Sequence, residues 1–520
     1  MDVPRETAPE RPTRGWWERR RCLVALVVLS AVPLLWPSLP PLTDLPGHMA
    51  RWHVSMAIGG SPALAHYYSY SWSLIGNLGL DLLVPPLAWL IGLEPAAKAV
   101  VVLIPTATAA AMLWIAFEAH GRVPPTAFIA LPFAYAWPFQ YGFVNFTLSQ
   151  ALALAAFALW LRLGRLDRLG LRALLFAPLA CLLWVAHTFG WGLFGLLAFG
   201  AELARRRAAG AVWRDAVLGA VGQCLTLTLP LIFMLLQPME TARGSSTGDW
   251  FNLSNKLLWL ITVLRDRWEW FDLAALAGSL LAIGAGAVDR RLGFSPLLAW
   301  PALLCLVAFL VLPRLLLGGA YVDMRMAPVT LALALLAIRP PANAPGLARL
   351  LAVAAIGFFG VRTAATTLSF VDRAAEQQHE LGAIAALPHG AAVLALVSRP
   401  CGGVWSDRRR DHLPALATVR RDAFVNSLWD IEGQQLLHIR YRRAAPYTGD
   451  PSQLVYPAHC AVTGSDFARA VATFPRDAFT HVWTIGFPPG AARAPDLRLV
   501  WTNGESALYR VRRQSRSASD

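Results

Sequence analysis

Long apolar stretches, separated by short polar loops, occupy most of the first 370 residues of the chain. Stretches of this kind recur at lengths that can cross the ~30 Å hydrocarbon core of a bilayer as helices. The pattern predicts an all-α, polytopic membrane domain over residues 22–371. The candidate crossings are residues 22–37, 78–93, 96–117, 125–141, 145–163, 171–204, 214–237, 270–288, 295–313, 325–338 and 349–370.

The stretch over residues 171–204 is too long for one crossing. A single helix of this length would extend ~50 Å at ~1.5 Å per residue, which exceeds the thickness of the hydrocarbon core. Arginines flank it at both ends, so two shorter crossings that return to the same side fit better. Their turn is expected at residues 186–190, on the outer side of the membrane.

Residues 78–163 contain four apolar candidates, whereas the flanking charges require an odd number of crossings. One candidate must therefore be re-entrant or wrongly divided. We expect this of the segment Phe133–Phe146, because Pro132, Pro138 and Gly142 interrupt it. A total of eleven or thirteen crossings fits the charges, and twelve does not.

Arginines indicate the orientation of the chain. They crowd the N-terminal tail 1–21 and four short loops, and cytoplasmic loops are enriched in such cations. The N-terminus is therefore expected in the cytoplasm, and the loop 38–77 and everything from Asp372 onward are expected outside. The first apolar stretch ends in Trp36-Pro37 without a small-residue cleavage site, so we expect an uncleaved anchor. This predicts a multi-pass protein of a bacterial inner membrane with a periplasmic C-terminal domain.

Composition adds one conclusion, which is that the chain is not expected to be a nucleic-acid-binding protein. Hydrophobic residues are 56% of the 520 residues, charged residues are 15%, and mean hydropathy is +0.46. The net charge of +14 would indicate nucleic-acid binding in a soluble protein. Because these cations lie mostly in short loops beside apolar stretches, we expect membrane lipids, and no nucleic acid, as partners.

The pattern after Asp372 is that of a soluble α/β domain, expected over residues 372–513 and followed by a disordered tail at 514–520. Short buried-type runs and a turn at Asn503-Gly504 predict the strands, and apolar residues at helical spacing predict the helices. Strands are expected at residues 391–398, 480–487, 497–502 and 507–512, and helices at residues 413–429 and 466–474.

Two of the six cysteines, Cys401 and Cys460, belong to this outer domain. The other four lie in or beside apolar stretches. Two isolated cysteines in an oxidising compartment are a candidate disulfide.

The first cluster of chemistry-bearing residues follows the first crossing, in Thr43–Trp52. If this segment is helical, Asp44, His48 and Arg51 have an i, i+4, i+7 spacing and share one face. An acid, an imidazole and a guanidinium on one face at a membrane surface indicate a reaction site.

A second cluster, Gly318–Arg325, lies in an expected outer loop and contains Asp323 and Arg325. An arginine at the outer end of a crossing departs from the positive-inside rule, and an anionic ligand such as a phosphate would compensate it. The more common alternative is a structural ion pair between Asp323 and Arg325. His187 is expected on the same side, where it either contacts the substrate or caps a buried carbonyl.

The whole arrangement resembles the GT-C glycosyltransferases, among them the protein O-mannosyltransferases and the lipid A aminoarabinose transferases. In residues the resemblance rests mainly on Leu42–Trp52. It implies a polyprenyl-phosphate-linked sugar donor used outside the membrane, with Asp44 in the catalytic acidic position. Asp44 has no adjacent second carboxylate, which leaves open whether a divalent metal takes part; no cofactor is otherwise expected.

We therefore expect an enzyme that transfers a sugar from this donor to an envelope lipid, glycan or protein outside the membrane. A carboxylate can deprotonate the acceptor hydroxyl, and an arginine can compensate the departing phosphate. No phosphate-binding glycine loop appears, as expected for a donor whose lipid tail partitions into the bilayer. The alternatives are a transporter or flippase without covalent chemistry and a non-catalytic subunit of an envelope-polysaccharide complex.

Overall fold

The computed structural model describes residues 15–236, 247–316, 318–339, 341, 343–431, 434–457, 460 and 466–512. The expected disordered tail 514–520, the first fourteen residues of the basic tail 1–21 and the last residue of the candidate crossing 214–237 lie outside the described residues.

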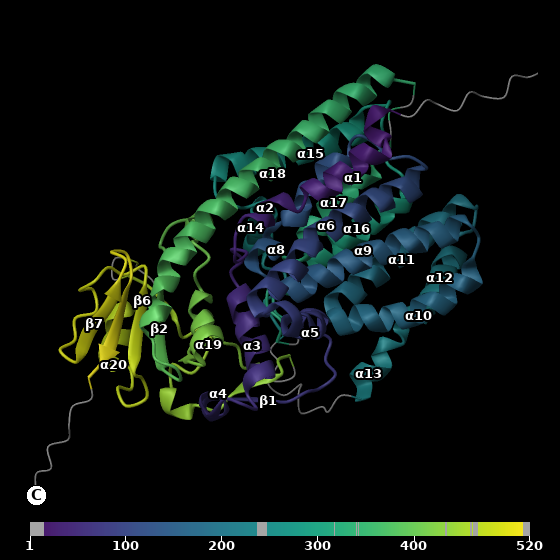
Figure 1. Ribbon diagram of the computed structural model, residues 1–520. Coiled ribbons are helices and arrows are strands. Elements are labelled where there is room, and N and C mark those ends of the chain that lie inside the picture. Colours follow the sequence, from purple (N-terminus) through teal and green to yellow (C-terminus); the bar gives the residue numbers. More distant parts are fainter. Residues whose placement is uncertain are drawn as a thin grey trace, which may run out of the picture.

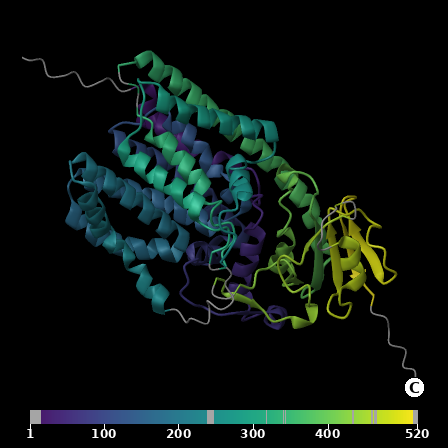
Figure 2. The same cartoon turned by 180° about the vertical axis from the view of Figure 1, so that it is seen from behind.

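The expected fold class is confirmed, because an apolar helical part precedes a smaller part that contains the sheet (Figure 1). The long apolar stretches form helices that run side by side in both views (Figures 1 and 2). The helices of this part are α1 (Arg20–Leu29), α2 (Val32–Leu35), α5 (Gly79–Ile91), α6 (Leu93–His120), α9 (Val144–Arg165), α10 (Leu169–Ala186), α11 (Thr188–Ala208), α12 (Trp213–Cys224), α13 (Pro230–Leu236), α14 (Leu253–Ile261), α15 (Glu269–Val288), α16 (Pro296–Val311), α17 (Met326–Ala337) and α18 (Pro345–Leu381).

Among the described residues, five helices are long and apolar enough to cross a membrane, namely α6, α9, α10, α15 and the helix that begins at Pro345. Shorter apolar helices are α5, α16 and α17. The chain therefore has the character of a multi-pass membrane protein, and the number of crossings stays a prediction.

Of the two irregular stretches expected in the bundle, the one at residues 186–190 is present, and the segment Phe133–Phe146 is irregular only as far as Phe143, because α9 begins at Val144. Residues 125–141 form short pieces, α7 (Ala127–Ala130), a 3-10 turn and α8 (Trp137–Tyr141), before Gly142 turns the chain at a φ of +100°. The stretch 171–204 is divided into α10 and α11, which meet at His187. At each of these breaks the backbone is not helical, and polar side chains lie next to it.

The segment 38–77, which the sequence predicts to be an outer loop, is folded onto the C-terminal part of the chain. It contains α3 (Leu45–Ala57), α4 (Pro62–Tyr67) and β1 (Tyr68–Tyr70). Strand β1 pairs antiparallel with β4 (Leu437–Ile439), so two segments more than 350 residues apart in sequence share one ribbon. This pairing fixes the position of α3, which carries the first polar cluster, against the C-terminal domain.

Helix α18 joins the two parts without a break at the expected boundary, Asp372. Its 37 residues extend ~55 Å at ~1.5 Å per residue, well beyond the thickness of the hydrocarbon core. The helix therefore continues from the bundle toward the sheet, as Figure 1 shows. A domain division at residue 372 falls inside a continuous helix.

The C-terminal sheet has the strand order β3-β2-β6-β8-β7, with β5 beside β2. Strand β2 is parallel to β3, β5 and β6, whereas β8 is antiparallel to β6 and β7. The elements are β2 (Ala392–Ser398), α19 (Leu416–Arg421), β3 (Phe424–Val425), β5 (Leu454–Val455), α20 (Phe467–Thr473), β6 (His481–Ile485), β7 (Leu497–Thr502) and β8 (Ala507–Val511).

The strands expected from the sequence are present, but the helix expected at residues 413–429 is wrong beyond Arg421. Asp422 adopts a left-handed conformation with a φ of +51°, which ends α19. The chain then turns into β3, which pairs with β2. Pairing with a distant strand, rather than local helical spacing, decides the structure of this segment.

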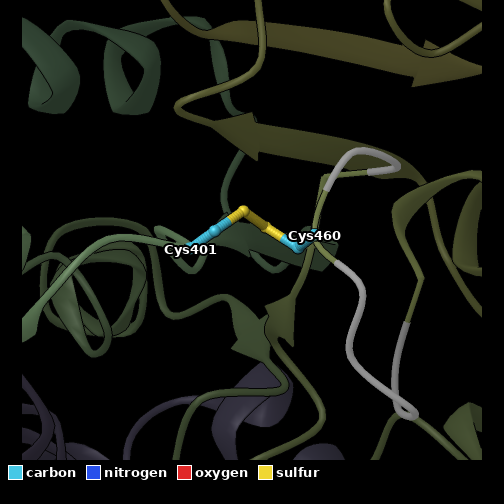
Figure 3. The surroundings of a disulfide bond; sticks show 2 residues. All are labelled: Cys401 and Cys460. Atoms are coloured by element: carbon cyan, nitrogen blue, oxygen red, sulfur yellow. A yellow bond between two sulfur atoms is a disulfide. The ribbon is translucent and has the colours of Figure 1, made fainter.

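Cys401 and Cys460 are joined in a disulfide, with their Cα atoms 5.5 Å apart (Figure 3). The bond connects the loop after β2 to the segment after β5. Cys22, Cys181, Cys224 and Cys305 are free.

Candidate active site

A cavity of about 1130 Å³ lies between the helical bundle and the C-terminal domain. One part of its wall is apolar and comes from α10, α11 and α16, and the other part is polar and comes from α3, the helix breaks and the C-terminal loops. The apolar wall includes Trp184, Trp191, Leu196, Leu304, Val307 and Val311. The polar wall includes Asp44, His48, His187, Arg325, Arg399, Asp411, His412 and Asp450.

Asp44 is the N-cap residue of α3, yet its carboxylate accepts no capping hydrogen bond from this described helix. An N-cap aspartate ordinarily accepts from the N–H groups of the first turn. Here Oδ1 is buried and finds no hydrogen-bond partner among the described residues. The backbone holds the residue instead, since its N–H donates to the Tyr141 carbonyl at 2.9 Å. The carboxylate is thus left available to a group in the cavity.

Gly142 allows this arrangement. A Cβ atom at this position would lie 2.7 Å from the backbone nitrogen of Asp44 and 3.0 Å from its Cβ. The positive φ of Gly142 is also strained for residues with a side chain. The break between α8 and α9 is therefore shaped so that the start of α3 can pack against it.

Two carboxylates on the polar wall, those of Asp44 and Asp411, are harder to ionise than ordinary carboxyl groups. Burial, reinforced by the charges of Asp450 and Asp411, raises the pKa of Asp44 well above the usual carboxyl range, and Arg325 opposes this rise. Burial and the charge of Asp407 raise the pKa of Asp411 to about 6, against the opposing charge of Arg399. A carboxylate with a raised pKa is a stronger base toward a hydroxyl proton.

His48 lies one turn after Asp44, and its imidazole also lines the cavity. Burial, together with the charge of Arg51, lowers the pKa of His48 well below its usual range, so the ring is neutral. Its Nδ1 atom is buried and has no hydrogen-bond partner among the described residues. The ring packs beside the indole of Trp429, which also lines the cavity.

Arg51 does not line the cavity, although we expected it to contact the substrate. Its Nε and Nη2 atoms donate to the two carboxylate oxygens of Asp81 at 2.9 and 2.7 Å, and both side chains are at most 5% exposed. Its Nη1 atom donates to Gln435. The guanidinium is thus engaged in a buried, bidentate ion pair that joins α3 to α5, and the geometry does not support a substrate contact.

Arg325 lines the cavity at the start of α17 and is held mainly by aromatic rings. Its guanidinium lies 4.6 Å from the ring centre of Phe143 and 5.2 Å from that of Phe146. Nη2 donates to the Ala320 carbonyl at 3.2 Å. No carboxylate of the described residues lies within ion-pair distance of Arg325, and its Nε has no partner among them.

Asp323 is paired with Lys256 and not with Arg325. The ammonium of Lys256 donates to Asp323 Oδ2 at 3.2 Å and to the carbonyls of Phe309 and Leu312. Asp323 is 1% exposed and is not part of the cavity wall. The expected substrate contact of Asp323 is therefore unsupported, and the alternative of an Asp323–Arg325 clamp is wrong.

His187 occupies the junction of α10 and α11 and faces Arg325. Its Nδ1 accepts the backbone N–H of Phe189 at 3.1 Å, which caps α11. Its Nε2 lies 3.2 Å from Arg325 Nη1. Segments 138 residues apart in sequence therefore bring these two nitrogens together at the cavity.

The C-terminal domain supplies site residues that the sequence pattern did not reveal, among them Arg399, Asp411, His412 and Asp450. Arg399 Nη1 donates to Asp411 Oδ2 at 2.9 Å. His412 Nε2 lies 3.6 Å from Asp44 Oδ1 and 3.7 Å from Asp450 Oδ1. The only signal in the sequence is the dipeptide Asp411-His412 after three arginines, which looks like a solvated loop.

Arg409 connects three of the segments that form the polar wall. Its side chain is fully buried, and it donates to the Pro41 carbonyl, to Gln140 and to Asp266. Pro41 precedes Asp44 by three residues, Gln140 adjoins Tyr141, and Arg409 precedes Asp411 by two. This guanidinium thus fixes the segment before α3, the break before α9 and the Asp411 loop relative to one another.

The described residues contain no group of three or more histidine, cysteine, aspartate or glutamate side chains arranged to hold a metal ion.

The sequence of the chain has no match among known families or curated proteins. Among solved structures, the chain is similar to apo ArnT from Cupriavidus metallidurans, at 14% sequence identity and a TM-score of 0.46. The similarity covers 94% of this chain and 96% of that chain.

Proposed function

We propose that the protein is a membrane glycosyltransferase that moves a sugar from a polyprenyl-phosphate donor to an acceptor hydroxyl outside the membrane. The observation that carries this proposal is one cavity in which the uncapped Asp44 carboxylate and an apolar wall of membrane helices meet. A lipid-linked sugar has the same division into an apolar tail and a polar head. The apolar wall suits the polyprenyl chain, and the polar wall suits the sugar and phosphate.

The pairing of His187 with Arg325 supports a phosphate position. Because the Phe189 N–H donates to Nδ1, a neutral His187 ring carries its proton on Nε2. That proton then faces Arg325 Nη1, which is also a donor, at 3.2 Å. Two donors without an acceptor between them are unfavourable, and a phosphate oxygen that accepts from both would satisfy them.

The reaction assigned to the site is a displacement at the anomeric carbon. Asp44 removes the proton of the acceptor hydroxyl, and the acceptor oxygen forms a bond to that carbon. The bond from the anomeric carbon to the phosphate oxygen breaks, and its electron pair leaves with the polyprenyl phosphate. Arg325 and His187 stabilise the charge that develops on this phosphate.

Deletion of the gene tests the proposal directly. The deletion strain is expected to accumulate one polyprenyl-phosphate sugar, measured by mass spectrometry of extracted lipids, and the purified protein should release polyprenyl phosphate from it when membranes supply the acceptor. A transporter or flippase would change the side of the membrane on which the lipid is exposed and would release no polyprenyl phosphate. A non-catalytic subunit would release none without its partner.

The orientation proposed for the chain places residues 372–520 in the periplasm. A reporter that folds only in the periplasm is expected to be active when fused after Asp520, because the arginine clusters favour a cytoplasmic N-terminus. Cys401 and Cys460 should resist alkylation until reductant is added. Activity of a cytoplasm-dependent reporter at the same position would contradict the orientation, and alkylation of both thiols without reductant would contradict the disulfide.

A further inference from the structure

His412 is the one imidazole that the C-terminal domain, as far as it is described, contributes to the cavity wall. It is 5% exposed and packs against Trp429, with ring centres 4.3 Å apart. A second contact fixes the rotation of the ring, since Nδ1 lies 2.7 Å from the carbonyl oxygen of Ser427. The other nitrogen, Nε2, is thereby directed at Asp44 and Asp450.

The Ser427 contact decides which nitrogen carries the proton. A backbone carbonyl only accepts hydrogen bonds, so His412 Nδ1 must be the donor. In the neutral ring Nε2 then carries a lone pair, and it lies 3.6 Å from Asp44 Oδ1. Site distances of this length commonly shorten when substrate binds. A basic atom is therefore held beside the buried Oδ1 atom of Asp44, which has no hydrogen-bond partner among the described residues.

Asp44 needs such a neighbour once it has acted as a base. It then holds a proton in a buried position, beside the carboxylates of Asp450 and Asp411, and cannot begin another turnover until that proton leaves. We propose that His412 is a proton relay, which takes from Asp44 the proton given up by the acceptor hydroxyl. This inference rests on the function proposed above.

The relay balances without a further reactant. The acceptor O–H bond breaks as its proton moves to Asp44 Oδ1, while the acceptor oxygen bonds to the anomeric carbon and the phosphate leaves with its electron pair. The proton then moves from Oδ1 to His412 Nε2, which restores the Asp44 carboxylate and gives an imidazolium. Water admitted as polyprenyl phosphate departs takes the proton from Nε2.

The test compares the first turnover with later turnovers in the His412→Ala variant. The substrate is the polyprenyl-phosphate sugar purified from the deletion strain, and the readout is polyprenyl phosphate released per protein molecule. The first turnover is expected to keep most of its rate, whereas steady-state kcat should fall ~100-fold with little change in the KM for the donor. Added imidazole should restore steady-state turnover, and pyrazole, which has the same size but is a far weaker base, should not.

His438→Ala is the matched control, because this histidine of the same domain pairs with Asp430 and is not part of the cavity wall. It should leave both rates unchanged. If His412→Ala does not fold, His412→Asn replaces it, since its amide can still donate toward Ser427. An equal loss in first and later turnovers, or equal effects of imidazole and pyrazole, would overturn the relay. Failure of the proposed function is distinct, because the native protein would then release no polyprenyl phosphate at all.

Discussion

Replacing Asp44 by asparagine is expected to abolish sugar transfer while leaving the protein folded in the membrane. The substitution keeps the shape of the side chain and removes its basic charge, and general-base catalysis by one side chain contributes ~10²- to 10⁴-fold to a rate. Because the carboxylate caps no N–H group of the described α3, no hydrogen bond of that helix is lost with it. The measurement is release of polyprenyl phosphate from the lipid-linked sugar of the deletion strain.

The pH dependence of the rate of the native protein is a second test of the role of Asp44 as a base. Asp44 must be ionised to act, so the rate should fall as the pH is lowered through its pKa. Burial and the neighbouring carboxylates raise that pKa, so the loss should begin at a higher pH than for an ordinary carboxyl. Asp477→Asn, a change in the C-terminal domain at an exposed carboxylate that pairs with Arg443 and does not line the cavity, should retain activity. Full activity of Asp44→Asn would remove Asp44 from the mechanism.

Local patterns predict the helical bundle and the principal strands because those elements depend on near neighbours in the chain. Apolar length identifies the membrane helices, and the breaks at Gly142 and His187 follow from the residues that interrupt apolar runs. The segment after Arg421 differs, since β3 pairs with β2, whose partner residues lie 32 positions earlier in the chain. Composition changes at Asp372, and this change gives no sign that α18 continues through that residue as one helix.

For the site, the sequence predicts those polar residues that stand out because they lie directly beside an apolar stretch. Asp44 and His48 follow the first apolar stretch, His187 and Arg325 lie at ends of apolar stretches, and all four line the cavity. Arg51 and Asp323 fit the same criteria.

These two residues are engaged instead by partners distant in sequence. Asp81 lies 30 residues from Arg51, and Lys256 lies 67 residues from Asp323. The sequence does not predict His412 as a site residue, because its proximity to Asp44 exists only in the folded chain.

Replacing Arg325 by lysine is expected to weaken use of the donor far more than it weakens folding. Lysine keeps a positive charge but lacks the planar fork that binds two phosphate oxygens at once and stacks on the rings of Phe143 and Phe146. Loss of an interaction of ~2–3 kcal/mol would lower donor efficiency by roughly 30- to 150-fold. The measurements are kcat/KM for the lipid-linked sugar and binding of undecaprenyl phosphate to the purified protein.

Arg362→Lys is the matched control, because this buried arginine pairs with Asp272 at 2.6 Å and does not line the cavity. It should lower the thermal stability of the protein, since a buried ion pair is weakened, and leave the affinity for undecaprenyl phosphate unchanged. Arg325→Lys should give the reverse pattern, because no described carboxylate depends on Arg325 for its ion pair. If Arg325→Lys binds undecaprenyl phosphate as tightly as the native protein and differs only in stability, Arg325 supports the start of α17 and the phosphate lies elsewhere in the cavity.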